Sequence, residues 1–329
     1  MSFTNYIDHS FEVANAPQEG SVTSKMNVKT DDSDKQDKKS NNDFEKVEIP
    51  RHDLDKWDLS KIKRYFSMIV FGCRRSGKSH LVNDLIQKIA PRMKFTNVIL
   101  ISATSKVQKE YWTFIPDENK FDTLNNDHIN GIYNDCIKLN EEYQQNPNNF
   151  EIEPHTLLIF DDMISDSGGK SIFWLQAVNR LYFAGRHAKI SCLLLLQAFK
   201  CVAPIVRSNT DYLVYFRTMK REDRKGIAGE YLTYSDEKEC LDNGLQLMSD
   251  VTSETYCSLV IDKSEGQYAS SFKEYVYCYK ADAKLKNLDK VKIYKDFKAK
   301  TDTTVLKSIT EKLFNKKKKK KLTFNPEKL

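Results

Sequence analysis

The sequence lacks the features that mark disulfide-rich, zinc-binding or membrane-spanning proteins. Its seven cysteines are an odd number and form neither a CxxC pair nor a Cys/His cluster. The longest apolar stretch, Leu193–Leu196 with its neighbours, is far too short to cross a bilayer, and the start MSFTNYIDHS has no signal-peptide pattern. We therefore expect a soluble, intracellular protein with reduced thiols and no membrane span.

The sequence also lacks an excess of charge of one sign outside a single run. Its 52 basic and 46 acidic residues give a formal net charge of +6, for which the lysines of 316–321 fully account. Nucleic-acid binding therefore cannot be inferred from the charge of the rest of the chain. The lysine run itself allows three interpretations: a grip on DNA phosphates, a nuclear address, or a solvated tail.

The chain divides into three parts by composition. Residues 1–48 are rich in Asp, Ser, Lys, Asn and Gln and are predicted to be disordered, because they cannot bury enough apolar surface to offset the entropy of ordering. Residues 49–280 are predicted to form one domain with a core at 66–216. Residues 281–329 form a Lys-rich C-terminal tail.

Short apolar runs alternate with helical patterns from Trp57 onward, which is typical of an α/β fold with a central, mostly parallel, twisted sheet flanked by helices. Helices are predicted over 79–90, where Pro91 should end the first one, and over 127–145 and 171–182. Two later β-rich runs, TYCSLVID and EYVYCYK, predict a small C-terminal β/α extension, either as added strands of the sheet or as a separate hairpin. The strands of the core are predicted at 66–71, 97–102, 156–160, 190–196 and 212–216.

The strongest motif is Gly72-Cys73-Arg74-Arg75-Ser76-Gly77-Lys78-Ser79, which follows an apolar run and precedes a helical pattern. Its glycines allow backbone N–H groups to surround a β-phosphate, and the next helix presents its positive end. Lys78 should reach the β and γ oxygens, and Ser79 should ligate Mg²⁺. A tight turn would require the glycines but not the Lys-Ser pair, so we predict that this eight-residue loop binds ATP with Mg²⁺. Arg74 and Arg75 either add charge near the phosphates or are simply solvated.

Three further polar residues follow predicted strands. Asp161 and Asp162 end the run TLLIFDD, where Asp161 should hold Mg²⁺ and Asp162 should orient or deprotonate the attacking water. The alternative is that the pair only ends a strand and begins a turn. Gln197 follows KISCLLLL at the sheet edge where ligands collect, so it either senses the γ-phosphate and water or caps the strand.

Two arginines, Arg186 in GRHAKIS and Arg207 in PIVRSN, are candidates for an arginine finger that acts across a subunit boundary. Arg186 is the preferred catalytic candidate. A surface salt bridge is the competing interpretation for each.

Together, GCRRSGKS, LLIFDDM, FAGRHAKISCLLLLQAF and PIVRSN resemble the genome-packaging ATPases of large DNA viruses, the poxvirus-type branch of the FtsK/HerA superfamily. The resemblance covers about residues 66–216. It implies an ATP-driven homo-oligomeric ring that moves double-stranded DNA into a preformed capsid, with capsid or portal-vertex proteins as partners. It implies a location in the host cytoplasm, viral factory or virion, and the lysine run leaves a nuclear location open. The superfamily more often has Glu at the position of Asp162.

Other classes of P-loop protein fit the sequence less well. A small-molecule kinase usually needs an arginine-rich lid and an acceptor site, and neither stands out. A GTPase would normally carry an Asn-Lys-x-Asp motif, which is absent. A nucleotide-gated scaffold that binds partners through its ends, without fast turnover, remains an alternative to the motor.

Overall fold

The computed structural model describes residues 54–104, 112–122, 124–161, 175–233, 238–266, 269, 271–285 and 291–294. The segment predicted to be disordered, 1–48, lies outside these residues, as does the lysine run 316–321.

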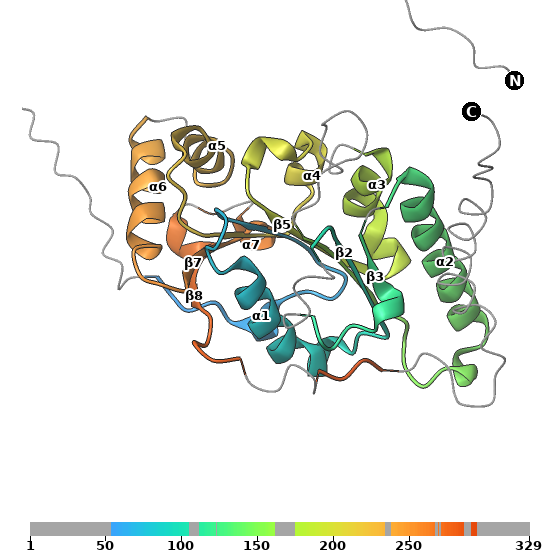
Figure 1. The fold of residues 1–329 in the computed structure, drawn as a ribbon. Helices are drawn as coiled ribbons and strands as arrows, with labels where there is room; N and C mark the ends of the chain where they lie inside the picture. Colours follow the sequence, from blue (N-terminus) through green and yellow to red (C-terminus); the bar gives the residue numbers. More distant parts are fainter. Residues whose placement is uncertain are drawn as a thin grey trace, which may run out of the picture. The chain divides into compact units, whose positions relative to one another are not determined.

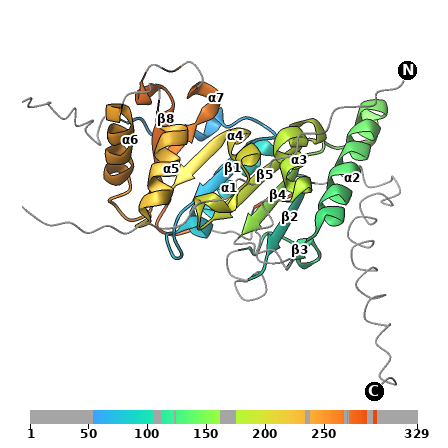
Figure 2. The same cartoon turned by 90° about the horizontal axis from the view of Figure 1, so that it is seen from above.

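The described residues form an eight-stranded sheet with the order β3-β2-β4-β5-β1-β6-β7-β8 (Figure 2). All pairings among β1 to β6 are parallel, whereas β7 is antiparallel to both β6 and β8. The predicted mostly parallel central sheet is therefore confirmed. The strands are β1 (Ser67–Phe71), β2 (Asn97–Ser102), β3 (Lys120–Phe121), β4 (Thr156–Asp161), β5 (Ile190–Leu196), β6 (Tyr212–Tyr215), β7 (Cys257–Asp262) and β8 (Val276–Lys280).

The predicted strands agree with the observed ones to within one residue at each end. Strand β3 was not predicted, because two residues are too few to produce an alternating pattern. The two C-terminal β-rich runs are strands β7 and β8, so they extend the sheet and do not form a separate hairpin.

Helices cover both faces of the sheet. Figure 1 shows α1 below the sheet and α3 to α5 above it, and residues of α2 and α6 pack in the same core as those of α3 to α5. Side chains of β1 point alternately to the two faces of the sheet. Met68 and Val70 pack in the core with α1, whereas Ile69 and Phe71 pack in the core with α2 to α6. The helices are α1 (Lys78–Met93), α2 (Asn126–Gln145), α3 (Gln176–Ala184), α4 (Pro204–Ser208), α5 (Arg221–Tyr231), α6 (Lys238–Val251) and α7 (Lys263–Gly266).

The predictions for the first and third helices need correction at one end. The first helix was predicted to end at Pro91, but α1 continues to Met93. Pro91 lacks only its own backbone N–H, so it removes one hydrogen bond of the helix. The N–H of Lys94 still donates to the carbonyl of Ala90 at 2.8 Å, and the burial of Met93 stabilises this last turn. Helix α3 begins at Gln176, because Leu175 is extended, and the predicted residues 171–174 lie outside the described chain.

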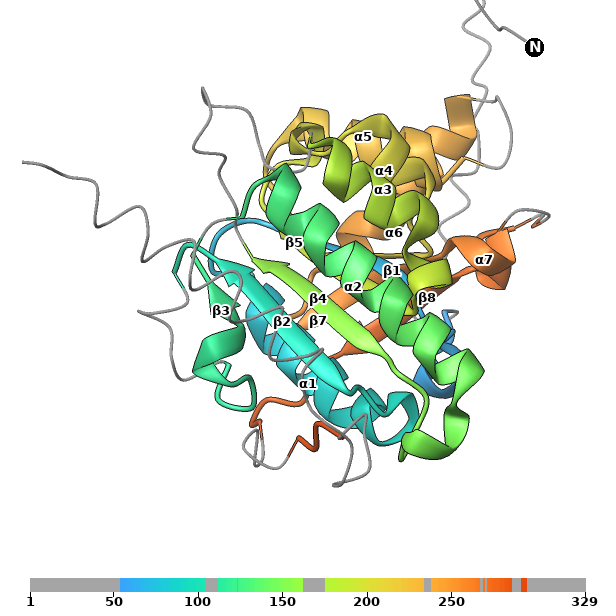
Figure 3. The ribbon, with the colours of Figure 1, turned by 90° about the vertical axis from the view of Figure 1, so that its right-hand side faces the viewer.

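Helix α2 matches its prediction and runs beside α3 along the sheet (Figure 3). It begins with a capping box, in which Asn125 accepts from the N–H of His128 at 2.9 Å. This local signal fixes where the helix starts.

Candidate nucleotide-binding site

The glycine loop connects β1 to α1. The N–H of Gly72 donates to the carbonyl of Leu196 on β5 at 3.1 Å, which ties the start of the loop to the neighbouring strand. A Cβ at Gly72 would lie 2.5 Å from Oγ of Ser76 and 2.7 Å from Cβ of Phe216, so a side chain does not fit there. Gly77 caps α1 with φ +97°, a conformation that favours glycine. Both glycines of the motif are thus required by local geometry.

Lys78 is the first residue of α1, and its side chain turns back into the loop. Its Nζ donates to the carbonyls of Gly72 and Cys73, both at 3.0 Å, and the residue is only 6% exposed. Ser76 contributes a buried Oγ that has no hydrogen-bond partner among the described residues. A curled loop with an inward ammonium group, an orphaned hydroxyl and a helix N-terminus fits the phosphates of a nucleotide.

The other loop residues differ in exposure. The thiol of Cys73 donates to the carbonyl of Arg217 at 3.1 Å, which joins the loop to the segment after β6. Arg74 and Arg75 are exposed, and Arg75 has φ +63°. Ser79 is half-buried in the first turn of α1. The exposure of the two arginines is compatible with both interpretations, charge near the phosphates and simple solvation.

Asp161 and Gln197 lie at the same edge of the sheet as the loop. Asp161 is the last residue of β4, is 3% exposed and pairs with Leu195 of β5. Gln197 directly follows β5 and is exposed. Because β5 lies between β4 and β1, the structure brings Asp161, Gln197 and the loop onto three adjacent strand ends. Asp162 lies outside the described residues.

Arg186 lies at the end of strand β5 opposite the phosphate loop, where the parallel strands begin. It precedes β5, and the seven residues of that strand separate the two edges by about 20 Å. Arg186 and His187 are exposed and line a cavity of about 700 Å³ together with Asp211, Glu230 and Lys263. Within this cavity, burial lowers the pKa of Lys263. Because the length of β5 lies between them, Arg186 cannot reach the phosphate loop of its own chain.

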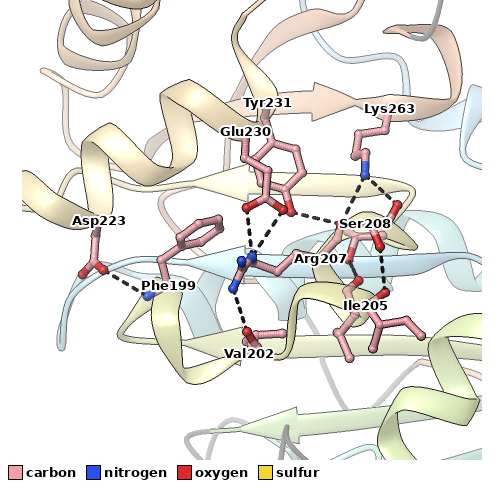
Figure 4. A network of polar contacts seen from close by, with 11 residues as sticks. Phe199, Val202, Ile205, Arg207, Ser208, Asp223, Glu230, Tyr231 and Lys263 are labelled. Carbon is pink, nitrogen blue, oxygen red and sulfur yellow. Dashed lines mark hydrogen bonds and ion pairs between the residues drawn. The ribbon is translucent and has the colours of Figure 1, made fainter. Parts of the chain in front are cut away.

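Arg207 is held by contacts within its own chain (Figure 4). Its Nε donates to Oε2 of Glu230 at 2.9 Å, its Nη1 donates to the carbonyl of Val202 at 2.8 Å, and its guanidinium lies 4.7 Å from the ring centre of Phe199. Its backbone carbonyl also accepts hydrogen bonds from Tyr231 and Lys263. These contacts favour the salt-bridge interpretation of Arg207.

Three aromatic or imidazole side chains beside the loop were not predicted from the sequence. Phe216 follows β6 and lies against Gly72. Tyr256 lies against Gly77, and its ring centre is 5.2 Å from that of His80. The position of His80 directly after the motif was the one available signal, because the other two are distant in sequence.

The described residues contain neither a metal-binding cluster nor a membrane-spanning helix. No group of three or more His, Cys, Asp or Glu side chains is placed to hold a metal ion there. Such a cluster is not needed for Mg²⁺ in phosphate-binding proteins, where one or two protein oxygens join phosphate and water ligands. None of the helices in the same residues is sufficiently long and apolar to cross a membrane.

Comparison with known proteins identifies the family. The family model of the poxvirus A32 protein matches residues 55–305, which is well over half of the chain. The chain belongs to this family. The resemblance to poxvirus-type packaging ATPases that the motifs predict is therefore confirmed, as is the P-loop ATPase fold.

Individual relatives come from a mimivirus and an invertebrate iridescent virus. Uncharacterized protein L437 of Acanthamoeba polyphaga mimivirus is 22% identical over 182 residues, which cover 55% of this chain and 62% of that protein. Uncharacterized protein 075L of Invertebrate iridescent virus 6 is 27% identical over 213 residues, covering 65% of this chain and 76% of that protein. The match thus spans less than two thirds of the mimivirus protein.

Among solved structures, the chain is similar to the genome packaging NTPase B204 from Sulfolobus turreted icosahedral virus 2, described in complex with ATP-gammaS. The TM-score is 0.46 at 16% identity, and the match covers 67% of this chain and 99% of B204.

Proposed function

We propose that this chain is a motor that hydrolyses ATP at residues 72–79 and uses the energy to move double-stranded DNA into a preformed capsid. The observation that carries the proposal is the meeting of the phosphate loop, Gln197 and Asp161 on three adjacent strand ends in a member of the poxvirus A32 family. Ligands of open α/β sheets bind at this edge.

Each residue of this edge has a role that suits its chemistry. Lys78 would exchange the loop carbonyls for β- and γ-phosphate oxygens, since its ammonium group already lies inside the loop. Ser79 and Asp161 would hold Mg²⁺, which supplies positive charge to the phosphates. Asp162 would orient or deprotonate water, and Gln197 would contact that water or the terminal phosphate.

Arg186 supports assembly into a homo-oligomeric ring. Because it lies at the sheet edge opposite its own loop, it could contact phosphates only in a neighbouring subunit. A head-to-tail ring would place the two edges of successive subunits against each other. Capsid or portal-vertex proteins would then dock this ring on the particle.

An ATPase assay with and without double-stranded DNA tests the proposal. We expect DNA to stimulate hydrolysis in the unchanged chain. Lys78→Ala should abolish hydrolysis and nucleotide binding, whereas Asp162→Asn should bind ATP without turning it over. Lys138→Ala is the matched control, because Lys138 is exposed on α2, on the sheet face opposite α1.

Each alternative class has its own outcome in the same assay. Phosphoryl transfer to a nucleoside would indicate a kinase, and ATP binding without turnover in the unchanged chain would indicate a scaffold. Retained turnover in Asp162→Asn would remove that residue from its catalytic role.

A further inference from the structure

Tyr256 is an exposed tyrosine in a backbone conformation that side chains rarely adopt. It lies between α6 and β7, with φ +65° and a relative exposure of 39%. A non-glycine residue in the left-handed region costs about 1–2 kcal/mol and persists only where surrounding structure holds it. Backbone strain of this kind is concentrated at ligand-binding and active sites.

The turn that carries Tyr256 is fixed by the end of strand β8. The carbonyl of Tyr256 accepts from the N–H of Ala281 at 3.3 Å. Within the turn, the N–H of Cys257 donates to the carbonyl of Glu254 at 3.2 Å, and the Glu254 carboxylate pairs with Lys280 at 2.5 Å. The ring is therefore presented by a defined turn and not by a free loop.

The ring of Tyr256 lies over the end of the phosphate loop. A Cβ on Gly77 would be 3.6 Å from its Cδ1, which is ordinary van der Waals contact. Its ring is tilted by 33° against that of His80, at a centroid distance of 5.2 Å. The imidazole is itself fixed, because Nε2 donates to the carbonyl of Asp282 at 2.6 Å.

The sheet topology places this pair of rings on one side of the loop and the acidic residue on the other. Strand β7 is antiparallel to β6, so it begins at the edge where β1 and β6 end. Asp161 ends β4 and Gln197 follows β5, whereas Tyr256 precedes β7 on the other side of β1. A nucleotide carries its base at the end opposite its terminal phosphate. The terminal phosphate would therefore lie on the side of Asp161 and Gln197, and the base on the side of Tyr256.

We propose that Tyr256 and His80 form a stacking platform for the nucleobase of the bound nucleotide. This inference rests on the proposed function, since it requires that residues 72–79 bind a nucleoside triphosphate. Stacking on an aromatic ring accepts every base, because each base has a π-face. Tyr256 is thus a positioning residue that adds affinity for the base without selecting adenine over guanine.

The test compares ligands that share phosphates but differ in the base. Dissociation constants for ATPγS, GTPγS and inorganic tripolyphosphate, each with Mg²⁺, are measured by calorimetry for the unchanged chain and for Tyr256→Ala. We expect Tyr256→Ala to weaken both nucleotides by about tenfold or more, as loss of one stacking contact implies, and to leave tripolyphosphate unchanged. Tyr256→Phe, which keeps the ring, should behave like the unchanged chain.

Other outcomes overturn the platform. Equal weakening of nucleotides and tripolyphosphate would mean that Tyr256 acts on the loop, and unchanged nucleotide affinity would mean that it does nothing for the base. In the unchanged chain, ATPγS must also bind more tightly than tripolyphosphate, a comparison that requires no variant. Failure of the proposed function is distinguishable, because in that case Lys78→Ala would bind ATPγS like the unchanged chain.

Discussion

Gly77 combines a left-handed backbone with a position beside Tyr256, whose Cδ1 would lie 3.6 Å from a Cβ added there, and it is the N-cap of α1. A Cβ at this position would meet no severe clash, so the cost of a substitution comes from its φ of +97°. At Gly77 a side chain is disfavoured by the backbone conformation, whereas at Gly72 it is excluded by the lack of space.

Gly77→Ala should destabilise the protein by about 1–2 kcal/mol and weaken nucleotide binding, because alanine strains the left-handed conformation. Urea unfolding and calorimetric titration with ATPγS measure the two effects. Gly131→Ala is the control, since Gly131 lies within α2 and, outside the helix's own adjacent backbone, no atom of the described residues comes within 4 Å of the added Cβ. That change should stabilise the protein by about 0.5–1 kcal/mol. Unchanged stability and affinity in Gly77→Ala would contradict the argument.

His155 is a fully buried imidazole with two fixed partners. Its Nδ1 donates to the carbonyl of Met93 at 3.0 Å, which leaves Nε2 to accept from the hydroxyl of Ser191 at 2.8 Å. Burial lowers the pKa of His155 to about 4 from its usual 6.5. The folded protein therefore keeps this side chain neutral at pH values where the unfolded chain protonates it.

The free energy of unfolding should consequently fall as the pH drops from about 6.5 to about 4, because the unfolded state binds more protons in that window. His155→Gln cannot titrate, so its unfolding free energy should depend less on pH there than that of the unchanged chain. His187→Gln, the same change at an exposed position, serves as the control for the substitution itself. Urea unfolding at several pH values decides, and equal slopes for His155→Gln and the unchanged chain would refute the account.

At the scale of elements, the last strand is attached to the helix that begins at the phosphate loop. The hydroxyl of Tyr279 on β8 donates to Oδ2 of Asp84 on α1 at 2.6 Å, and Lys88 donates to the same oxygen at 3.0 Å. Asp84 is 1% exposed, so its carboxylate depends on these donors. Burial and the neighbouring carboxylate raise the pKa of Tyr279.

Tyr279→Phe should therefore lower stability by about 1–3 kcal/mol, since it leaves a buried carboxylate with one donor fewer. Tyr277→Phe is a matched change on the same strand, where the hydroxyl donates to Glu265 at 2.7 Å. Glu265 is exposed and can be hydrated, so this loss should be smaller. Denaturant unfolding compares the two, and an equal or larger loss for Tyr277→Phe would show that the buried carboxylate is not the cause.

At the scale of the whole molecule, the opposite positions of Arg186 and the phosphate loop predict shared sites between subunits. Lys78→Ala should be inactive because it lacks the lysine of the phosphate loop. If Arg186 contacts phosphates across a subunit boundary, Arg186→Ala should also lose turnover, by roughly hundredfold or more. Arg180→Ala, which changes an arginine of α3 that lies over the Tyr133 ring, should keep its activity.

Mixing the two inactive variants gives the decisive result. In a mixed head-to-tail ring, about a quarter of the boundaries would join an intact loop to an intact Arg186, so ATPase activity should partly return. Activity that stays at the level of the separate variants would contradict a role for Arg186 across the boundary.

The sequence by itself determined the features that depend on neighbouring residues. The loop from Gly72 to Ser79, the buried strands and the start of α2 are each specified by a contiguous pattern of glycine, apolar period or helix cap. For the same reason, Asp161 and Gln197 could be predicted at strand ends, and a parallel sheet then requires those ends to share one edge.

The tertiary structure alone decided which distant segments meet. The periodicity of the sequence does not indicate whether β7 and β8 extend the sheet. It also does not indicate that Tyr279 contacts Asp84, 195 residues away, or that Tyr256 lies beside Gly77. Arg186 and Arg207 look alike in sequence, yet one is exposed beside a cavity and the other is bound to Glu230. These outcomes follow from burial and pairing of the whole chain, which no local pattern encodes.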